Sequence, residues 1–209
     1  VFIDAKLSQS SLNKMHAEAI KLSFEAITVD GDTSPNDSSL LVANGNKEKS
    51  VKNGSLAEKR LSKAVVEIFK GLAELLIEDA EGATKKIKVK VGKAKSIEQA
   101  KSVAFTIAES PLVKTAMFGS DANWGRILSA IGRNKTIEDI NKVMIKLNDQ
   151  PLVKQGFIDP NYSEKLASKA MKKKEIFIDV SLGMGAREFE VLTSDLSEDY
   201  VLINSDYRS

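Results

Sequence analysis

The sequence predicts an α/β or α+β fold, in which helices pack against a layered, mixed β-sheet. Segments with strand character alternate with segments whose apolar residues recur at spacings of three and four, which indicates both element types. Strands that follow one another closely within residues 26–43 and 176–192 favour mixed or antiparallel pairing over a purely parallel sheet. With 209 residues, of which 42% are hydrophobic, the chain can bury a sizeable core.

The N-terminal part is predicted to form a strand and then a helix. Residues 1–5 resemble the inside of a β-strand, and we expect earlier residues of that strand to precede Val1. Ser10 or Ser11 caps an amphipathic helix, whose apolar face carries Leu12, Met15, Ala19 and Leu22. His16 lies beside this face, where a boundary side chain without a catalytic role is expected.

A polar loop at residues 30–37 is predicted between two short strands at 26–29 and 40–43. Turn-forming residues then predict a second, solvent-exposed loop at 44–53. Ser55 caps a long helix. For this helix we expect a buried face formed by Leu61, Val65, Ile68, Leu72 and Leu75.

The second half of the chain continues the alternation of strands and helices. Ile87, Val89 and Val91 alternate with lysines and predict a half-exposed strand. Ser96 and Gln99 form a capping box. The helix that it opens carries Ile97, Ala100, Ala104 and Ile107 on one face. Further predicted elements are strands at 115–118 and 142–147, helices at 124–132 and 163–173, and a closing strand pair at 176–182 and 187–192, joined through 183–185.

Composition and missing motifs exclude several classes of function. The absence of cysteine removes disulfides, thiolate nucleophiles and cysteine zinc sites, and a single histidine removes almost every multi-histidine metal site. The net charge of +2 lacks the basic excess of a nucleic-acid binder. No membrane span, signal peptide, phosphate-binding loop, dinucleotide fingerprint or hydrolase elbow is present. We therefore expect a soluble, intracellular protein without nucleic-acid or membrane partners, metal or bound cofactor. It is expected in the cytoplasm, or in an organelle matrix if the source is eukaryotic.

Three polar clusters are candidates for chemistry. Three acids in residues 30–37 could bind a hard cation, but their spacing differs from the EF-hand pattern and the same residue types form tight turns. Asp79 and Glu81 lie where the long helix ends, an unfavourable place for carboxylates that hints at function. Asp121 or Asn123 precedes the helix containing the only tryptophan and is explained by an N-cap alone.

Several stretches resemble the ornithine acetyltransferases, also called glutamate N-acetyltransferases, which act in arginine biosynthesis. Residues 23–37 follow the family signature S-F-x-x-I-T-V-D-G-D-T-S-x-N-D. Further agreement, in the same order as in the family, is found at residues 41–45, 79–85, 123–127, 195–201 and 203–209. These stretches span nearly the whole chain. Ala122, where the family usually has proline, and Ser209, where threonine is frequent, are departures that remove no reacting group.

The resemblance implies that residues 1–209 are the β chain of a precursor that cleaves itself before a threonine. That threonine, expected to precede Val1, would be the nucleophile, so no catalytic residue is assigned within this chain. The implied fold is of the N-terminal-nucleophile type and is completed by a separate α chain, which supplies the oxyanion hole. An (αβ)₂ heterotetramer is expected.

The implied reaction moves the acetyl group of N-acetylornithine to glutamate through an acetyl-threonine intermediate. No cofactor is expected, although acetyl-CoA serves as an alternative acetyl donor in bifunctional members of the family. The resemblance assigns substrate binding to Glu81, Asn204 and Ser209. The Glu81 carboxylate would hold an ammonium group of the substrate or orient the amine of the nucleophile, and Asn204 and Ser209 would contact the substrate carboxylate.

Two alternatives belong to other classes. In the first, the chain is part of a self-cleaving N-terminal-nucleophile aminopeptidase or amidase of similar fold, in which water accepts the acyl group. In the second, it is a non-catalytic subunit that has lost the nucleophile. The matches at Glu81 and at residues 204–209 argue against the amidase.

Overall fold

The computed structural model describes residues 1–46 and 50–207. Within them the chain divides into two units of structure. The first contains Val1–Ile27 and Thr33–Leu76, and the second contains Thr28–Asp32 and the chain from Ile77 onward. The polar loop at residues 30–37 is therefore shared between the two units.

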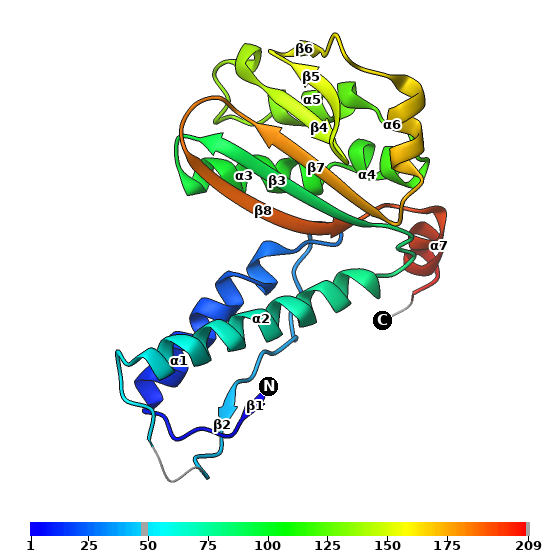
Figure 1. Cartoon of the computed structure of the whole chain (residues 1–209). Coiled ribbons are helices and arrows are strands. Elements are labelled where there is room, and N and C mark those ends of the chain that lie inside the picture. The colour runs from blue at the N-terminus through cyan, green and yellow to red at the C-terminus, as the bar shows by residue number, and fades with distance from the viewer. Residues whose placement is uncertain (47–49, 208–209) are drawn as a thin grey trace. The chain divides into compact units, whose positions relative to one another are not determined.

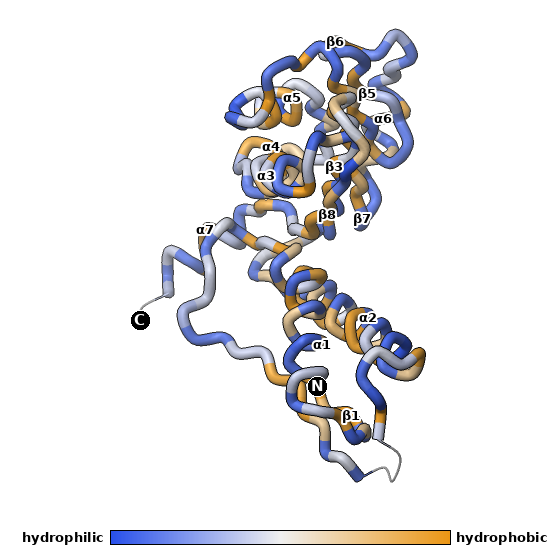
Figure 2. Tube along the Cα trace, turned by 90° about the vertical axis from the view of Figure 1, so that its left-hand side faces the viewer, coloured by the Kyte–Doolittle hydropathy of each residue, from blue (hydrophilic) through white to orange (hydrophobic). Residues whose placement is uncertain are grey.

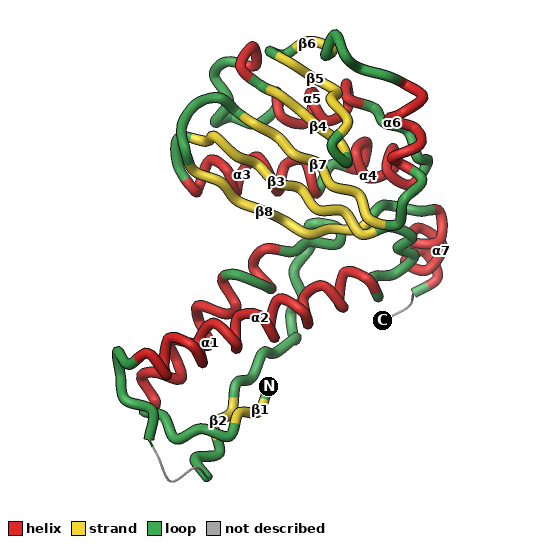
Figure 3. The backbone as a smooth tube through the Cα atoms, viewed as in Figure 1, coloured by secondary structure: helices red, strands yellow, loops and turns green. Residues whose placement is uncertain are grey.

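The first unit is built on two helices and a short parallel strand pair. Strand β1 (Phe2–Ile3) pairs with β2 (Val42–Ala43), which confirms strands at both predicted places in shorter form. Helix α1 (Gln9–Lys21) lies beside α2 (Leu56–Glu78), the last two residues of which belong to the second unit (Figure 3). Their core consists of Met15, Ala19, Leu41, Val65, Val66 and Phe69.

Two predictions for the first helix and its flanks need correction. Ser8, rather than Ser10 or Ser11, caps α1, because its side chain accepts the Ser11 amide at 3.2 Å while Ser11 itself is buried. The strand expected at residues 26–29 is absent there. Instead a 3₁₀ helix, η1 (Phe24–Ala26), is followed by an irregular segment with one ladder-like hydrogen bond, from the Thr28 amide to the Leu192 carbonyl.

The buried face of α2 was also predicted incorrectly in part. Val65 is buried as expected, but Ile68, Leu72 and Leu75 are exposed. The helix instead buries Val65, Val66, Phe69, Ala73 and Ile77. Apolar residues thus occupy two sides of α2, as the mixed colouring along its trace illustrates (Figure 2), and the sequence periodicity did not distinguish the covered side from the uncovered one.

The second unit contains a six-stranded mixed sheet in the order β6-β5-β4-β7-β3-β8 (Figure 1). Helices α3, α4 and α5 cover one face of the sheet, and α6 contacts β5. The strands are β3 (Lys86–Ala94), β4 (Met144–Leu147), β5 (Gln150–Lys154), β6 (Phe157–Ile158), β7 (Glu175–Ser181) and β8 (Arg187–Ser194). Of these, β5 and β6 were not predicted.

Strand β3 lies between the two last strands of the chain. It runs parallel to β7, with Val89 opposite Ile178, and antiparallel to β8, with Val89 opposite Val191. The expected closing hairpin is therefore wrong: β7 and β8 both form as predicted, but β3 separates them. The lysines of β3 face the more polar side, where Lys88 and Lys90 form ion pairs with Glu190 and Glu188 at 3.4 and 3.0 Å.

The helices of this unit follow the sequence with two exceptions, one of which is the helix at residues 198–206, which was not predicted. Residues 115–118, predicted as a strand, belong to helix α4 (Pro111–Phe118), because Ser110 and Pro111 start a helix there and the Thr115 hydroxyl donates back to the Pro111 carbonyl. The other helices are α3 (Ile97–Ala108), α5 (Trp124–Gly132), α6 (Glu164–Met171) and α7 (Glu198–Asp206). A second 3₁₀ helix, η2 (Ile140–Lys142), precedes β4.

The mixed, layered α/β architecture predicted from the sequence is confirmed. The core between the sheet and its helices is formed by the buried side of β3, β4 and β7 together with α3, α4 and α5. Among the described residues, no helix combines the length and the apolar character needed to cross a membrane.

Candidate functional site

Glu81 lies in a tight turn between α2 and β3. Helix α2 ends at Glu78, and the turn is closed by a hydrogen bond from the Ala83 amide to the Ala80 carbonyl at 2.9 Å. The Glu81 side chain is exposed, as is suitable for a carboxylate that meets a charged ligand. The turn then leads directly into β3, a strand hydrogen-bonded on both sides by β7 and β8, so that the backbone that follows Glu81 is well supported.

Gly82 allows the last helix to approach this turn closely. Its φ of +64° is the left-handed conformation that glycine adopts without steric cost. A Cβ atom at this position would lie 2.5 Å from the Tyr200 amide nitrogen and 2.8 Å from the Ser197 hydroxyl. The hydroxyl of Ser197 donates to the Gly82 carbonyl at 2.6 Å and also caps α7 by accepting the Tyr200 amide at 3.3 Å. The turn and the start of α7 are therefore in direct contact.

A buried carboxylate fastens the same two segments. Asp195 is only 3% exposed, and its Oδ1 atom accepts the amides of Thr84 and Lys85 at 2.8 and 2.9 Å. Its second oxygen accepts the Thr84 hydroxyl. Asp195 thereby joins the end of β8 to the chain just after Glu81.

Two lysine amines lie under this region. The Lys114 side chain is 3% exposed and donates to the Thr193 hydroxyl at 2.8 Å and to the Ser194 carbonyl. Burial lowers the pKa of Lys114 to about 8, against the opposing influence of Asp195, Asp30 and Glu109. Burial likewise lowers the pKa of Lys85, which donates to the Met117 and Met171 carbonyls and to the Ser120 hydroxyl, while Asp195 raises it.

Helix α7 brings Asn204 to Glu81 from a distance of 123 residues along the chain. The Asn204 Nδ2 atom donates to Glu81 Oε2 at 2.9 Å and to the Tyr200 carbonyl at 2.9 Å. Both side chains are exposed. Two residues that the family resemblance named as substrate-binding are thus in contact, and Asn204 belongs to a regular helix.

The polar loop at residues 30–37 contributes one side chain to the same neighbourhood. Asp30 Oδ2 accepts the hydroxyl of Tyr200 at 2.8 Å. Burial, followed by this carboxylate, raises the pKa of Tyr200 to about 12, so its hydroxyl stays protonated near neutral pH. In the rest of the loop Ser34 accepts the amide of Asp37 at 3.1 Å. Among the described residues, no group of three or more His, Cys, Asp or Glu side chains has an arrangement that could hold a metal ion.

The remaining predicted residues separate into three cases. Ser209 lies outside the described residues. Asn123 is the N-cap of α5, since its Oδ1 atom accepts the Arg126 amide at 3.1 Å. The Asn123 Nδ2 atom donates to Asp121 Oδ2 at 3.0 Å. Neither reaches Glu81 through a hydrogen bond. His16 contacts Ser39 at 3.0 Å and packs edge-on against Phe69, as expected for a boundary side chain.

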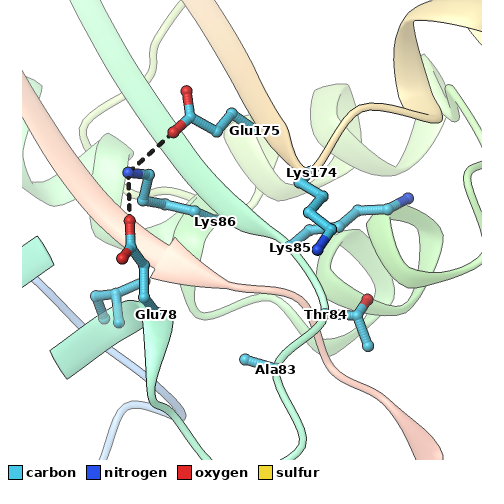
Figure 4. Close-up of a pocket in the computed structure, with 8 residues that line it drawn as sticks. Glu78, Ala83, Thr84, Lys85, Lys86, Lys174 and Glu175 are labelled. Atoms are coloured by element: carbon cyan, nitrogen blue, oxygen red, sulfur yellow. Dashed lines mark hydrogen bonds and ion pairs between the residues drawn. The ribbon is translucent and has the colours of Figure 1, made fainter. Parts of the chain in front are cut away.

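A pocket of about 340 Å³ adjoins the turn but is not formed by the predicted binding residues. Figure 4 shows Lys86 between the carboxylates of Glu78 and Glu175, at 2.8 and 3.0 Å, while the Lys85 side chain is directed away from them. The pocket is lined by Ile77, Glu78, Ala83, Thr84, Lys85, Lys86, Lys174 and Glu175. Glu78, Lys86 and Glu175 already pair with one another in this pocket. Lys174 is therefore the charged lining residue that remains as a candidate for binding a substrate.

Sequence reasoning missed the residues that hold Glu81 and Asn204 in place. Asp195, Ser197 and Tyr200 were quoted only as part of a resembling stretch. The serine followed by two acids at 197–199 is a recognisable helix start, which could have predicted α7. No local pattern indicates that Asp195 reaches Thr84, because that contact spans 111 residues.

Comparison with known proteins gives a consistent picture. The model of the ArgJ family matches residues 1–209. Two proteins named arginine biosynthesis bifunctional protein ArgJ are similar over almost the whole chain: that of Chlorobaculum tepidum is 44% identical over 206 residues, and that of Zymomonas mobilis is 42% identical over 212 residues. These matches cover 99% and 100% of this chain but only 50% and 52% of the relatives, so the chain spans about half of their length.

A solved structure supports the same relationship. The crystal structure of the arginine biosynthesis bifunctional protein ArgJ from Bacillus halodurans superimposes with a TM-score of 0.93 at 33% sequence identity. The match covers 99% of this chain and 98% of the chain in that structure. The resemblance to the ornithine acetyltransferases is thereby confirmed. Together with the match of the family model to residues 1–209, this structural similarity shows that the chain belongs to the ArgJ family.

Proposed function

We propose that this chain is the β chain of a cytoplasmic glutamate N-acetyltransferase of arginine biosynthesis, which transfers the acetyl group of N-acetylornithine to glutamate. The observation that carries the proposal is the hydrogen bond between Glu81 and Asn204. Family resemblance names both residues as substrate-binding, and the fold brings them together in an exposed position although 123 residues separate them. Membership of the ArgJ family, whose named relatives act in arginine biosynthesis, supports the same reaction.

Glu81 and Asn204 must exchange partners when an amino-acid substrate binds. Both N–H groups of the Asn204 amide are already used, one by Glu81 and one by the Tyr200 carbonyl. A substrate ammonium that pairs with Glu81 would release one of these N–H groups, which could then donate to the substrate carboxylate. The amide could hold ornithine and glutamate in this way, because both carry an α-carboxylate.

The nucleophile in this proposal is a threonine that precedes Val1 in the precursor and becomes N-terminal by self-cleavage. Its α-amino group, with an ordinary pKa near 8, takes the hydroxyl proton as the oxygen attacks the acetyl carbonyl of N-acetylornithine. The amide bond breaks and ornithine leaves with a proton, which produces an acetyl ester on the threonine. The amine of glutamate then attacks that ester, and N-acetylglutamate is released as the threonine hydroxyl re-forms.

The proposed partner is the other half of the precursor, the α chain, in an (αβ)₂ heterotetramer. Two observations support a partner of this kind. The chain spans about half of its curated relatives, whereas it covers 98% of the chain in the Bacillus halodurans structure. In addition, Ile68, Leu72, Leu75 and Leu76 of α2 form an exposed apolar surface, which is typical of a surface that another chain covers.

The decisive experiment is an acetyl-transfer assay on the enzyme expressed from the complete precursor. Transfer from N-acetylornithine to glutamate is expected, with Glu81→Gln strongly impaired and Glu78→Gln, a nearby carboxylate outside the site, close to wild type. A parallel reaction with acetyl-CoA as donor determines whether the enzyme is restricted to N-acetylornithine or bifunctional. Release of free acetate without transfer to glutamate would favour the amidase alternative and remove the roles assigned to Glu81 and Asn204.

Mass spectrometry of the purified chains tests the nucleophile and the partner together. We expect a β chain that starts with threonine and co-purifies with an α chain. Leu72→Glu should reduce this association, whereas Lys63→Glu on the same helix should not. A mature chain without an N-terminal threonine would establish the non-catalytic alternative.

A further inference from the structure

Helix α7, which carries Asn204, has no hydrophobic anchor among the described residues. None of its residues, Glu198–Asp206, is fully buried, and only Tyr200 is half-buried. Its apolar side chains Val201, Leu202 and Ile203 are 58%, 60% and 44% exposed. Because apolar burial does not fix the helix, its position in this chain depends on polar contacts.

Those contacts lie on three successive turns of the segment. At the start, Ser197 is bonded to Gly82, and near the end Asn204 is bonded to Glu81. Between them the Tyr200 hydroxyl donates to Asp30 at 2.8 Å. Tyr200 also contacts Asn204 directly, because the Tyr200 carbonyl accepts a hydrogen bond from the Asn204 side-chain amide. A shift of Tyr200 would therefore move Asn204 as well.

Asp30 is itself held in a fixed place. Its Oδ1 atom accepts the Asp32 amide at 2.9 Å, while Oδ2 remains for Tyr200. The Gly31 amide donates to the Thr28 hydroxyl at 3.1 Å, and the Thr28 amide donates to the Leu192 carbonyl of β8 at 3.0 Å. This short segment is thus attached to the sheet, and Asp30 presents its carboxylate from a supported backbone.

We propose that Asp30 is a positioning residue that acts through the Tyr200 hydroxyl to hold α7 where Asn204 reaches Glu81. The proposal rests on the function proposed above, in which Asn204 binds substrate, and gives the acid-rich loop a role in substrate binding. In this role Asp30 acts through Tyr200 and is not itself a substrate-binding or catalytic residue. Its loss should therefore weaken the binding of both amino acids and leave the acetyl-transfer step nearly unchanged.

The test compares four variants in the enzyme expressed from the complete precursor. Tyr200→Phe and Asp30→Ala both remove the link and should each raise KM for N-acetylornithine and for glutamate about tenfold, with kcat within about twofold. Asp30→Asn keeps the link, since its Oδ1 can accept the Asp32 amide and its Nδ2 can donate to the Tyr200 oxygen, and should stay near wild type. Asp37→Asn, on the same loop, is the matched control.

Hydrogen exchange of the amides of residues 201–206 gives a second readout that does not depend on activity. Exchange should be faster in Tyr200→Phe and Asp30→Ala than in the wild type and the two asparagine variants. If KM and hydrogen exchange are unchanged in both Tyr200→Phe and Asp30→Ala, the inference is overturned. The proposed function still stands in that case, provided that the wild-type enzyme transfers the acetyl group. Equal impairment of Asp30→Asn and Asp30→Ala would also overturn it, because charge would then matter instead of position. Absence of transfer by the wild type would refute the proposed function, and the exchange data would still decide whether the link holds α7.

Discussion

The two ends of the segment from Asp195 to Asp206 are held in opposite ways. At the first end Asp195 is buried and accepts three hydrogen bonds from Thr84 and Lys85. It lies near the amines of Lys85 and Lys114, whose pKa values are lowered by burial. At the second end Asn204 is exposed and held by single hydrogen bonds to Glu81 and Tyr200. The buried end is therefore suited to stability and the exposed end to exchange with a ligand, and substitutions at the two ends should separate these properties.

The largest effect is expected for Asp195→Ala. It leaves two backbone amides unpaired and removes the carboxylate that faces two partly buried lysine amines, which together should lower the free energy of unfolding by about 3–5 kcal/mol. Urea unfolding of the complex measures this loss, with the exposed Asp206→Ala as control. Equal stability of the two variants would contradict the assignment of Asp195 to the stable end.

The lowered pKa of Lys114 leads us to expect that the free energy of unfolding rises with pH. Its pKa of about 8 in the folded chain lies below the ordinary value of 10.5, so the unfolded chain binds more protons between these pH values. Unfolding free energy should therefore increase by about 3 kcal/mol from this group as the pH rises from 8 to 10.5. Urea titrations across this range should show the increase in wild type and in Lys165→Met, an exposed control, but not in Lys114→Met.

Gly82→Ala tests the close contact between the turn and α7. The added Cβ would meet the Tyr200 amide nitrogen at 2.5 Å and would also have to adopt a φ of +64°. A loss of about 2 kcal/mol is expected, together with a higher KM as α7 moves away. Gly45→Ala provides the control for backbone strain alone, since its φ is +71° and nothing lies within 4 Å. Equal losses in the two variants would exclude the close contact as a cause.

The smallest effect on stability, under about 0.5 kcal/mol, is expected for Asn204→Ala at the exposed end. Its KM for glutamate should nevertheless rise about tenfold, because the proposed contact of the Asn204 amide with the substrate carboxylate is lost. Ser205→Ala, the neighbouring position on the same helix, should change neither property. Destabilisation by Asn204→Ala with an unchanged KM would reverse the proposed division between the two ends.

The sequence predicted those elements of the fold that local patterns determine. Helix α5 begins and ends where expected, and β3 follows the alternation of Ile87, Val89 and Val91. Where the outcome depends on distant partners, prediction failed. Nothing in the sequence of β7 and β8 shows that β3 inserts between them, and the spacing of apolar residues on α2 fits two faces equally well.

The candidate site was predictable to a similar extent. Resemblance to a family named Glu81 and Asn204, and the structure places them within hydrogen-bonding distance. Ser209 stays a prediction. Polar loop residues look alike in sequence whether they only turn the chain or reach another element, so the difference between Asp30, bonded to Tyr200, and the turn-forming Ser34 could not be recognised.

The position of β3 between β7 and β8 imposes an order on folding. Both neighbours of this strand come from residues 175–194, about 90 to 110 positions later in the chain. During synthesis, β3 therefore remains without its neighbours in the sheet until residues 175–194 have been made. The contacts that join these strands are long-range ones, which form slowly. Since Glu81 enters this strand and Asn204 follows its last neighbour, the two halves of the candidate site can meet only as this late step is completed.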